Sequence, residues 1–73
     1  MMDITHDPEA DAVYIYLGGG KIDRQGEAGP FIYDMDSEGR IIGIEILSAS
    51  KVLAPGGWKN ARRPSAESAD AAE

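Results

Sequence analysis

With 73 residues, the chain has room for one small domain, whose folding buries only about 60% of the surface that the unfolded chain exposes. The lack of cysteine excludes disulfide bonds and thiolate metal sites, and no apolar run approaches the ~20 residues of a transmembrane helix. The net charge of −6 is already present in residues 1–57, where ten acidic residues outnumber four basic ones, so the charge disfavours nucleic-acid binding and suits a cation or a basic partner.

Two short β-strands are predicted at the N-terminus, joined as a hairpin over residues 2–17. The apolar and aromatic side chains of the second strand alternate, with Val13, Ile15 and Leu17 on one face and Tyr14 and Tyr16 on the other. Between the strands, Asp7-Pro8 is typical of the start of a turn. Proline presets φ at the second turn position, and the aspartate carboxylate can accept the backbone N–H two residues further on.

A loop is predicted over residues 18–30, GGGKIDRQGEAGP, because it contains five glycines and ends in a proline. Ile22 is compatible with a short extra strand there. GGGK lacks the Ser or Thr that follows the lysine in a phosphate-binding loop, so we do not expect phosphate binding.

Two further strands, FIYDM and RIIGIEIL, are predicted on either side of the turn DSEG. The second alternates, with Ile42, Ile44 and Ile46 on one face and Ile41, Gly43, Glu45 and Leu47 on the other. Four strands in sequence with tight connections predict an antiparallel meander.

A short helix is expected in SASKVLAP, with Ser48 or Ser50 as its N-cap and Pro55 ending it. Val52 and Leu53 would then cover the sheet. The expected fold class is therefore α+β, a small antiparallel four-stranded β-meander with one short helix. We expect the domain to span residues 1–57 and residues 58–73 to form a largely disordered tail, because this tail has little to bury. Trp58 is either an anchor for the tail or an interface residue.

The segment DMDSEGRIIGIE carries the acidic residues and the glycine of an EF-hand loop in nearly the right order, namely Asp34, Asp36, Glu38, Gly39 and Glu45. Its flanks are rich in β-branched residues, which favour strands rather than the two helices of an EF-hand. In an extended strand Glu45 would lie roughly 20 Å from Gly39, at about 3.3 Å per residue, beyond the reach of a shared ion. We therefore predict a hairpin turn with carboxylate hydrogen bonds and a positive φ at Gly39, and no metal site; weak attraction of a cation is left open.

Several short motifs occur along residues 2–53. They are Asp7-Pro8-Glu9-Ala10-Asp11 with Tyr14-Ile15, Asp34-x-Asp36-x-x-Gly39, Gly43-Ile44-Glu45-Ile46-Leu47 and Ala49-Ser50, and together they resemble the bacterial family called domain of unknown function 2283. The resemblance implies a compact sheet-plus-helix domain with no assigned activity and, for some members, an antitoxin-like partnership with small ribonuclease-type toxins. The chain departs from the family at DRQGEAGP, which replaces a threonine-containing segment usual there.

Glu45 is the most unusual carboxylate, because it interrupts an apolar strand where burial is costly unless the charge is paired. With His6 or Asp11 it could form a general acid–base pair. The alternatives are an ion pair with Arg40 or Lys51, or a solvated outer face.

One short helix cannot cover both faces of the predicted sheet, so we expect a homodimer or a protein partner. The candidate interface residues are Tyr14, Tyr16, Ile41 and Leu47. The function favoured by the sequence is a non-enzymatic protein-interaction module without a cofactor, an acidic partner of a small basic protein; the resemblance implies an antitoxin-like form of this role. The alternative is a small hydrolase-like enzyme that uses His6, Asp11 and Glu45 at a dimer interface. Because the N-terminus lacks a basic-then-apolar leader, a cytoplasmic location is expected.

Overall fold

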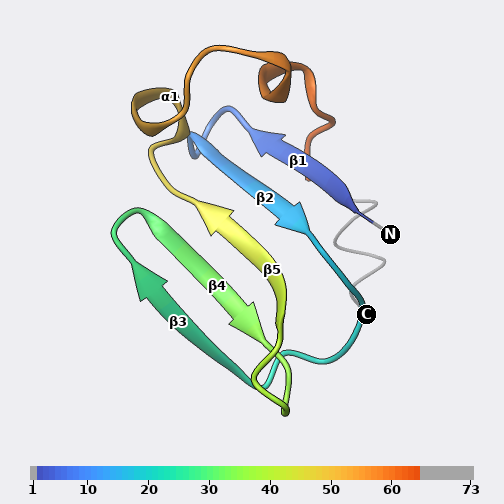
Figure 1. Ribbon diagram of the computed structural model, residues 1–73. Helices are drawn as coiled ribbons and strands as arrows, with labels where there is room; N and C mark the ends of the chain where they lie inside the picture. Colours follow the sequence, from blue (N-terminus) through green and yellow to red (C-terminus); the bar gives the residue numbers. More distant parts are fainter. Residues whose placement is uncertain (1, 65–73) are drawn as a thin grey trace.

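Five β-strands form one antiparallel sheet in the computed structural model, which describes residues 2–64 (Figure 1). They are β1 (Asp3–Asp7), β2 (Ala12–Tyr16), β3 (Arg24–Ala28), β4 (Phe31–Met35) and β5 (Ile41–Ile46), followed by the helix α1 (Ala49–Val52) and the 3-10 helix η1 (Gly57–Asn60). The strand order is β1-β2-β5-β4-β3. The expected α+β class with a short helix is confirmed, whereas the expected four-stranded meander is wrong. The sheet is a β1-β2 hairpin joined to a β3-β4-β5 meander by pairing of β2 with β5.

The missed strand is β3, which lies within the segment expected to be a loop. Its sequence, RQGEA, has no apolar alternation because an edge strand with mostly exposed side chains does not need one. It pairs with β4 across the two-residue turn Gly29-Pro30. Gly29 has a φ of +61°, the left-handed conformation that glycine supplies at the first position of such hairpin turns.

The N-terminal hairpin forms as predicted. Ile4 of β1 lies opposite Ile15 of β2, and the connecting turn begins at Asp7. The Asp7 carboxylate accepts the backbone N–H of Glu9 at 3.0 Å and that of Ala10 at 3.3 Å, as the Asp-Pro pattern predicts.

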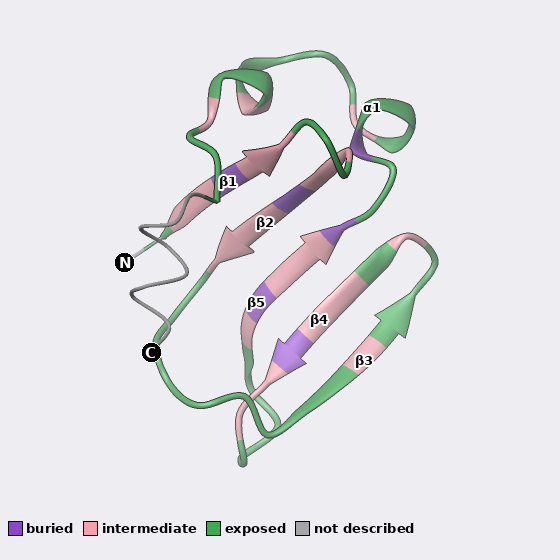
Figure 2. Ribbon diagram, turned by 180° about the vertical axis from the view of Figure 1, so that it is seen from behind, coloured by how far each residue is buried: buried purple, intermediate pink, exposed green. Residues whose placement is uncertain are grey.

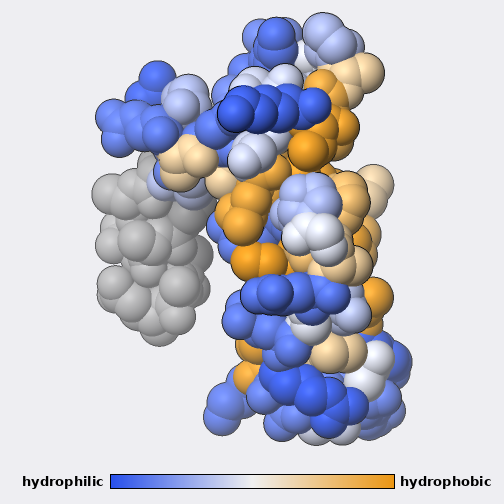
Figure 3. Space-filling model, turned by 90° about the vertical axis from the view of Figure 1, so that its left-hand side faces the viewer, coloured by the Kyte–Doolittle hydropathy of each residue, from blue (hydrophilic) through white to orange (hydrophobic). Residues whose placement is uncertain are grey.

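The register places side chains of opposite character on the two faces of the sheet. The apolar face carries Ile4, His6, Val13, Ile15, Ile44 and Ile46, and the polar face carries Thr5, Asp7, Tyr14, Tyr16, Asp34 and Glu45. This separation confirms the predicted alternation in β2 and in residues 43–46 of β5. The prediction fails at Ile41, because a register shift between Asp34 and Met35 pairs Ile41 with Met35 on the apolar face. Figure 3, which views the molecule from the side of β3 in Figure 1, shows apolar residues gathered along one side of the sheet.

The core lies where β2 and β5 meet α1. Val13, Ile46 and Ala49 are buried, and Leu53 and Trp58 pack against them together with neighbouring isoleucines (Figure 2). Pairing of β2 with β5 places Val13 opposite Ile46, so the most apolar positions of the two hairpins share one core.

The predicted helix forms as α1, and Ser48 precedes it, but the cap comes from elsewhere. Ser48 makes no side-chain cap hydrogen bond. Instead Asp11, in the β1-β2 turn, accepts Ala49 N–H at its carbonyl oxygen at 2.8 Å, Ser50 N–H at Oδ1 at 3.0 Å and the Ser50 hydroxyl at Oδ2 at 2.7 Å. Of the two residues expected to cover the sheet, Leu53 does so, whereas Val52 remains 43% exposed.

The chain stays in contact with the sheet beyond the domain limit expected at residue 57. Trp58 acts as an anchor: its indole N–H donates to Ala54 O at 2.7 Å, and its ring meets His6 edge-on with 5.0 Å between centroids. The carbonyl oxygen of Arg62 then accepts the His6 backbone N–H at 2.9 Å, along the outer edge of β1. Residues 65–73 of the predicted tail lie outside the described residues. Within residues 2–64, no helix has the length and apolarity needed to cross a membrane.

Candidate functional site

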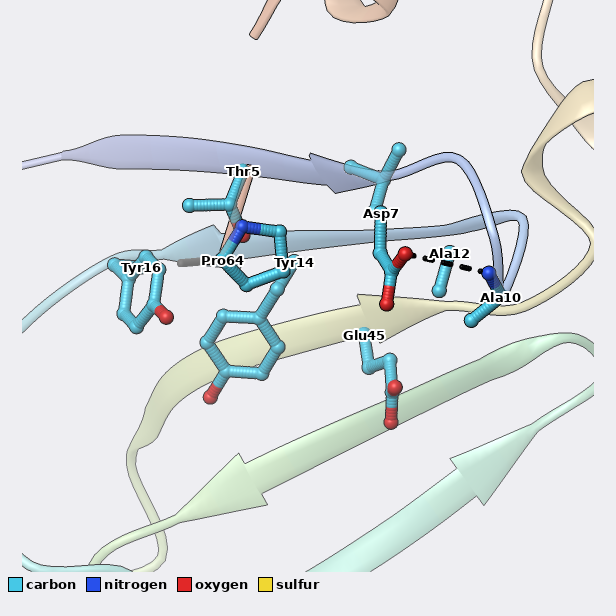
Figure 4. Close-up of a pocket in the computed structure, with 9 residues that line it drawn as sticks. Thr5, Asp7, Ala10, Ala12, Tyr14, Tyr16, Glu45 and Pro64 are labelled. Carbon is cyan, nitrogen blue, oxygen red and sulfur yellow. Dashed lines mark hydrogen bonds between the residues drawn. The ribbon is translucent and has the colours of Figure 1, made fainter. Parts of the chain in front are cut away.

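The polar face holds a pocket near the β1-β2 turn. Its volume is about 250 Å³, and it is lined by Thr5, Asp7, Ala10, Ala12, Val13, Tyr14, Tyr16, Glu45 and Pro64. The register explains why two carboxylates reach it. Asp7 lies opposite Ala12, and Glu45 lies opposite Tyr14, two residues along the same strand. Because Ala12 has only a methyl group, it leaves space between the two acids. Figure 4 shows both carboxylates on the same side of the sheet as the tyrosine rings.

The tyrosine wall of the pocket is held by a buried polar network. The Tyr14 hydroxyl donates a hydrogen bond to Asp34 Oδ2, and the Gln25 side-chain N–H donates to Asp34 Oδ1 at 2.7 Å. Asp34 is only 4% exposed, so these two donors replace the water that its carboxylate has lost. The ring of Tyr14 also meets that of Tyr16 edge-on at 4.5 Å between centroids. The hydrogen bond to Asp34 thus holds the Tyr14 ring, and the Tyr16 ring packs against it.

A glycine makes room for this arrangement. A Cβ on Gly43 would lie 2.6 Å from Tyr14 Cζ, well inside van der Waals contact. The Gly-Ile motif in β5 thus allows the ring to lie flat across the sheet and to reach Asp34 on β4. Burial raises the pKa of Tyr14, and the hydrogen bond to Asp34 raises it further. Its phenol is protonated at neutral pH and serves as a donor, not as a base.

The pocket is electronegative. Among the described residues that line it, two carry carboxylates and none is a lysine, arginine or histidine. Asp7 is fixed by the N–H groups of its own turn, whereas Glu45 has no hydrogen bond or ion pair within the described part of the chain. Two carboxylates beside aromatic faces attract a cation, through charge and through the negative faces of the rings. The volume lies below the ~300–1,000 Å³ of common small-molecule pockets, so it suits a single side chain or a small amine.

The residues considered for acid–base catalysis are not brought together in one site. His6 is on the apolar face against Trp58, and Glu45 is on the polar face. Asp11 lies in the turn and caps α1; its hydrogen bond from the Ser50 hydroxyl lowers its pKa. Glu45 forms no ion pair with Arg40 or Lys51, since the salt bridges within residues 2–64 do not include it.

The EF-hand-like segment is a hairpin turn. Asp36 Oδ1 accepts the backbone N–H groups of Glu38 and Arg40, both at 2.9 Å, and Gly39 has a φ of +81°. The hydrogen bond from Arg40 N–H is the main cause of a lowered pKa at Asp36. Asp34 points to Tyr14 rather than into the turn, and Glu45 lies along β5. Among the residues that the structure describes, no cluster of three or more His, Asp or Glu could hold a metal ion.

Two of the four candidate interface residues, Tyr14 and Tyr16, line the pocket on the polar face. Ile41 begins β5 and pairs with Met35 across a register shift, on the face that carries Tyr33, and Leu47 follows the strand; the two are 46% and 39% exposed. Sequence reasoning missed Asp7, Thr5 and Pro64 as pocket residues. The alternation along each strand indicates on which face Asp7 and Glu45 lie. Their proximity depends on the pairing of β5 with β2, which no local pattern specifies.

A comparison with known protein families gives a match. The family model described as Protein of unknown function (DUF2283) matches residues 3–50, which contain the first hairpin, the β3-β4-β5 meander and the start of α1. No curated protein and no solved structure matches the chain significantly.

Proposed function

For this chain, which belongs to the family described as Protein of unknown function (DUF2283), we propose a function that is argued from the pocket. The protein is a non-enzymatic interaction module that binds a basic protein partner. The polar face is the contact surface, and one lysine or arginine side chain of the partner enters the pocket. The observation that carries this proposal is that Asp7 and Glu45 line one pocket in which no described lining residue is basic.

The chemistry of the pocket favours a guanidinium or ammonium group. Asp7 keeps an oxygen available beyond the one that accepts its turn N–H groups, and both Glu45 oxygens are available in the described structure. Hydrogen bonds between ionised groups are roughly twice as strong as neutral ones, and a planar guanidinium can stack on a tyrosine ring at the same time. The exposed Leu47, two residues after Glu45, would contact the partner beside this charged centre.

The acidic balance of residues 1–57 supports the same class of partner, because it steers positively charged proteins towards this surface. An antitoxin-like role towards a small basic ribonuclease-type toxin is one form of this proposal, in a bacterial and cytoplasmic setting. The hydrolase-like alternative has less support, since His6 and Glu45 lie on opposite faces and the Tyr14 phenol is held protonated.

The test is a titration of the folded protein with N-acetyl-arginine amide and N-acetyl-lysine amide, followed by amide chemical shifts. We expect saturable shifts at Tyr14, Tyr16 and Glu45. Since hydrogen bonds to charged groups contribute about 1.5–3 kcal/mol, the double variant Asp7→Asn, Glu45→Gln should bind at least ~10-fold more weakly. Glu38→Gln is the matched control, because it removes an acid in the distant β4-β5 turn, where the side chain is exposed.

Affinity capture with the whole protein then tests whether a basic protein partner binds through the pocket. A basic protein retained by the wild type and the Glu38→Gln variant, but lost by the pocket variant and at high salt, is the expected result. Equal retention of the basic protein by all three proteins would contradict the proposed role of the pocket. In the titration, an uncharged amino-acid amide that binds as tightly as the arginine amide would also contradict it.

A further inference from the structure

One edge of the sheet is open and the other is covered. At the covered edge, the His6 N–H of β1 donates to Arg62 O at 2.9 Å. At the other, β3 is the last strand in the order, and no described strand lies beyond it. An uncovered strand edge presents unpaired N–H and C=O groups, which pair readily with another strand. The β3 edge is separate from the pocket, so strand pairing there does not depend on the proposed function.

The groups available at the open edge depend on the geometry of the β3-β4 hairpin. A two-residue turn joins Ala28 to Phe31 as a hydrogen-bonded pair, and such pairs alternate along an antiparallel ladder. The main-chain groups of Ala28, Gly26 and Arg24 therefore face β4. Those of Gln25 and Glu27 face outward.

We propose that β3 pairs with β3 of a second copy in an antiparallel register centred on Gly26, so that the two sheets form one continuous ten-stranded sheet with two-fold symmetry. In this register Gln25 of each copy lies opposite Glu27 of the other, and the outward-facing groups of both residues are paired. Arg24 of each copy lies opposite Ala28 of the other.

Charge selects this register over its neighbours. Centring on Gln25 would oppose Asp23 and Glu27, and centring on Glu27 would oppose two glutamates. Centring on Arg24 would oppose two arginines. Like charges directly opposite one another destabilise a strand pair, and the register centred on Gly26 places none opposite within β3. The charged residues of β3 therefore disfavour the other registers of this edge and are compatible with the register centred on Gly26.

The centre of the proposed interface also has a suitable shape. Gly26 meets Gly26 at the two-fold axis, where non-hydrogen-bonded Cα atoms approach to about 4.5 Å. On the apolar face the Tyr33 ring already lies over its own Gly26, where a Cβ would come 2.5 Å from Tyr33 Cζ. The two Tyr33 rings would thus flank the axis and shield it from water. Because the β1 edge is covered, pairing ends at two copies and does not propagate into a fibre.

Substitutions at Ala28, which is exposed and lies opposite Arg24 of the second copy, test the register. Ala28→Glu creates two Arg–Glu pairs across the interface, and Ala28→Lys creates two like-charged pairs. At the usual strength of cross-strand charge pairs, the dimer dissociation constant should fall roughly 2- to 30-fold in the first variant and rise by a similar factor in the second. Added salt should reduce both effects.

The controls are Ser37→Glu and Ser37→Lys, which make the same charge changes in the exposed β4-β5 turn and should leave the dimer unchanged. A five-residue strand pair is small beside the ~1,200–2,000 Å² of stable interfaces, so sedimentation equilibrium must extend to millimolar protein. Amide shifts that depend on protein concentration should centre on residues 25–27.

Three results would overturn the proposal. They are a wild-type monomer at every concentration, equal dissociation constants for the two Ala28 variants, and concentration-dependent shifts centred on Tyr14 and Ile41 instead of β3. A pocket variant, Asp7→Asn with Glu45→Gln, should dimerise like the wild type. Failure of amide binding and failure of β3 pairing are thereby distinguishable.

Discussion

Replacing Gly43 with alanine should force Tyr14 out of its place on the polar face. The added Cβ would lie 2.6 Å from Tyr14 Cζ and 3.0 Å from Cε2, so the ring must move and its hydrogen bond to Asp34 is lost. Overpacking costs about 1–3 kcal/mol, and a lost hydrogen bond to a charged group about 1.5–3 kcal/mol. Because Tyr14 is only half-buried and water partly replaces the lost bond, we expect a cost of about 2–4 kcal/mol. The total stability expected for a domain of this size is about 4–11 kcal/mol.

The assay is urea unfolding of four proteins: the wild type, Gly43→Ala, Tyr14→Ala and the double variant, all in the same stabilising osmolyte. With the ring removed, the Gly43→Ala substitution should cost less than about 0.5 kcal/mol, because its Cβ then meets empty space. Gly18→Ala is the matched control, since a Cβ there meets no atom within 4 Å and the change should stay within about 0.5 kcal/mol. An equal cost of Gly43→Ala with and without Tyr14 would refute the steric reasoning.

Two further predictions concern pH. Since the folded pKa of Tyr14 lies above its ordinary value of 10.0, its stabilising contribution is complete below about pH 10 and is lost as pH rises through the folded pKa. The difference in unfolding free energy between the wild type and Tyr14→Phe should therefore narrow in alkali, and an unchanged difference would contradict this assignment. The folded pKa of Asp11 lies below 3.8, so its contribution is present above that value and is lost as pH falls through the folded pKa. Asn tolerates the positive φ of Asp11, so Asp11→Asn removes the charge without straining the backbone. The difference in unfolding free energy between the wild type and this variant, measured by acid unfolding, should therefore vanish at low pH. A difference that persists would mean that the effect of the substitution is geometric and not electrostatic.

Local patterns in the sequence were sufficient to predict the elements that are held by hydrogen bonds between nearby residues or marked by a strong apolar alternation. Alternation predicted β2 and β5 as strands, and it predicted the faces of the side chains in β2 and in residues 43–46 of β5. Asp7-Pro8 predicted the turn and its carboxylate hydrogen bond. The Asp36 turn was predicted for the same reason, because its carboxylate bonds reach only four residues along the chain. β3 was missed because an edge strand of polar residues and glycine lacks a periodic apolar signal.

The pocket depended on long-range pairing and could not be derived from any local pattern. Asp7 and Glu45 are 38 positions apart in the sequence, and they line one pocket only because β5 lies between β2 and β4 instead of at an edge of the sheet. The cap of α1 is a similar case, since the capping carboxylate belongs to Asp11 in a turn 39 residues before Ser50. The sequence alone determined strands, turns, the acidic balance and the family resemblance, because these depend on neighbouring residues or on composition. Only the tertiary structure decided which carboxylates share a pocket and which sheet edge stays open, because both depend on the order of the strands, and strand order is set by the joint burial of Val13 and Ile46 in one core.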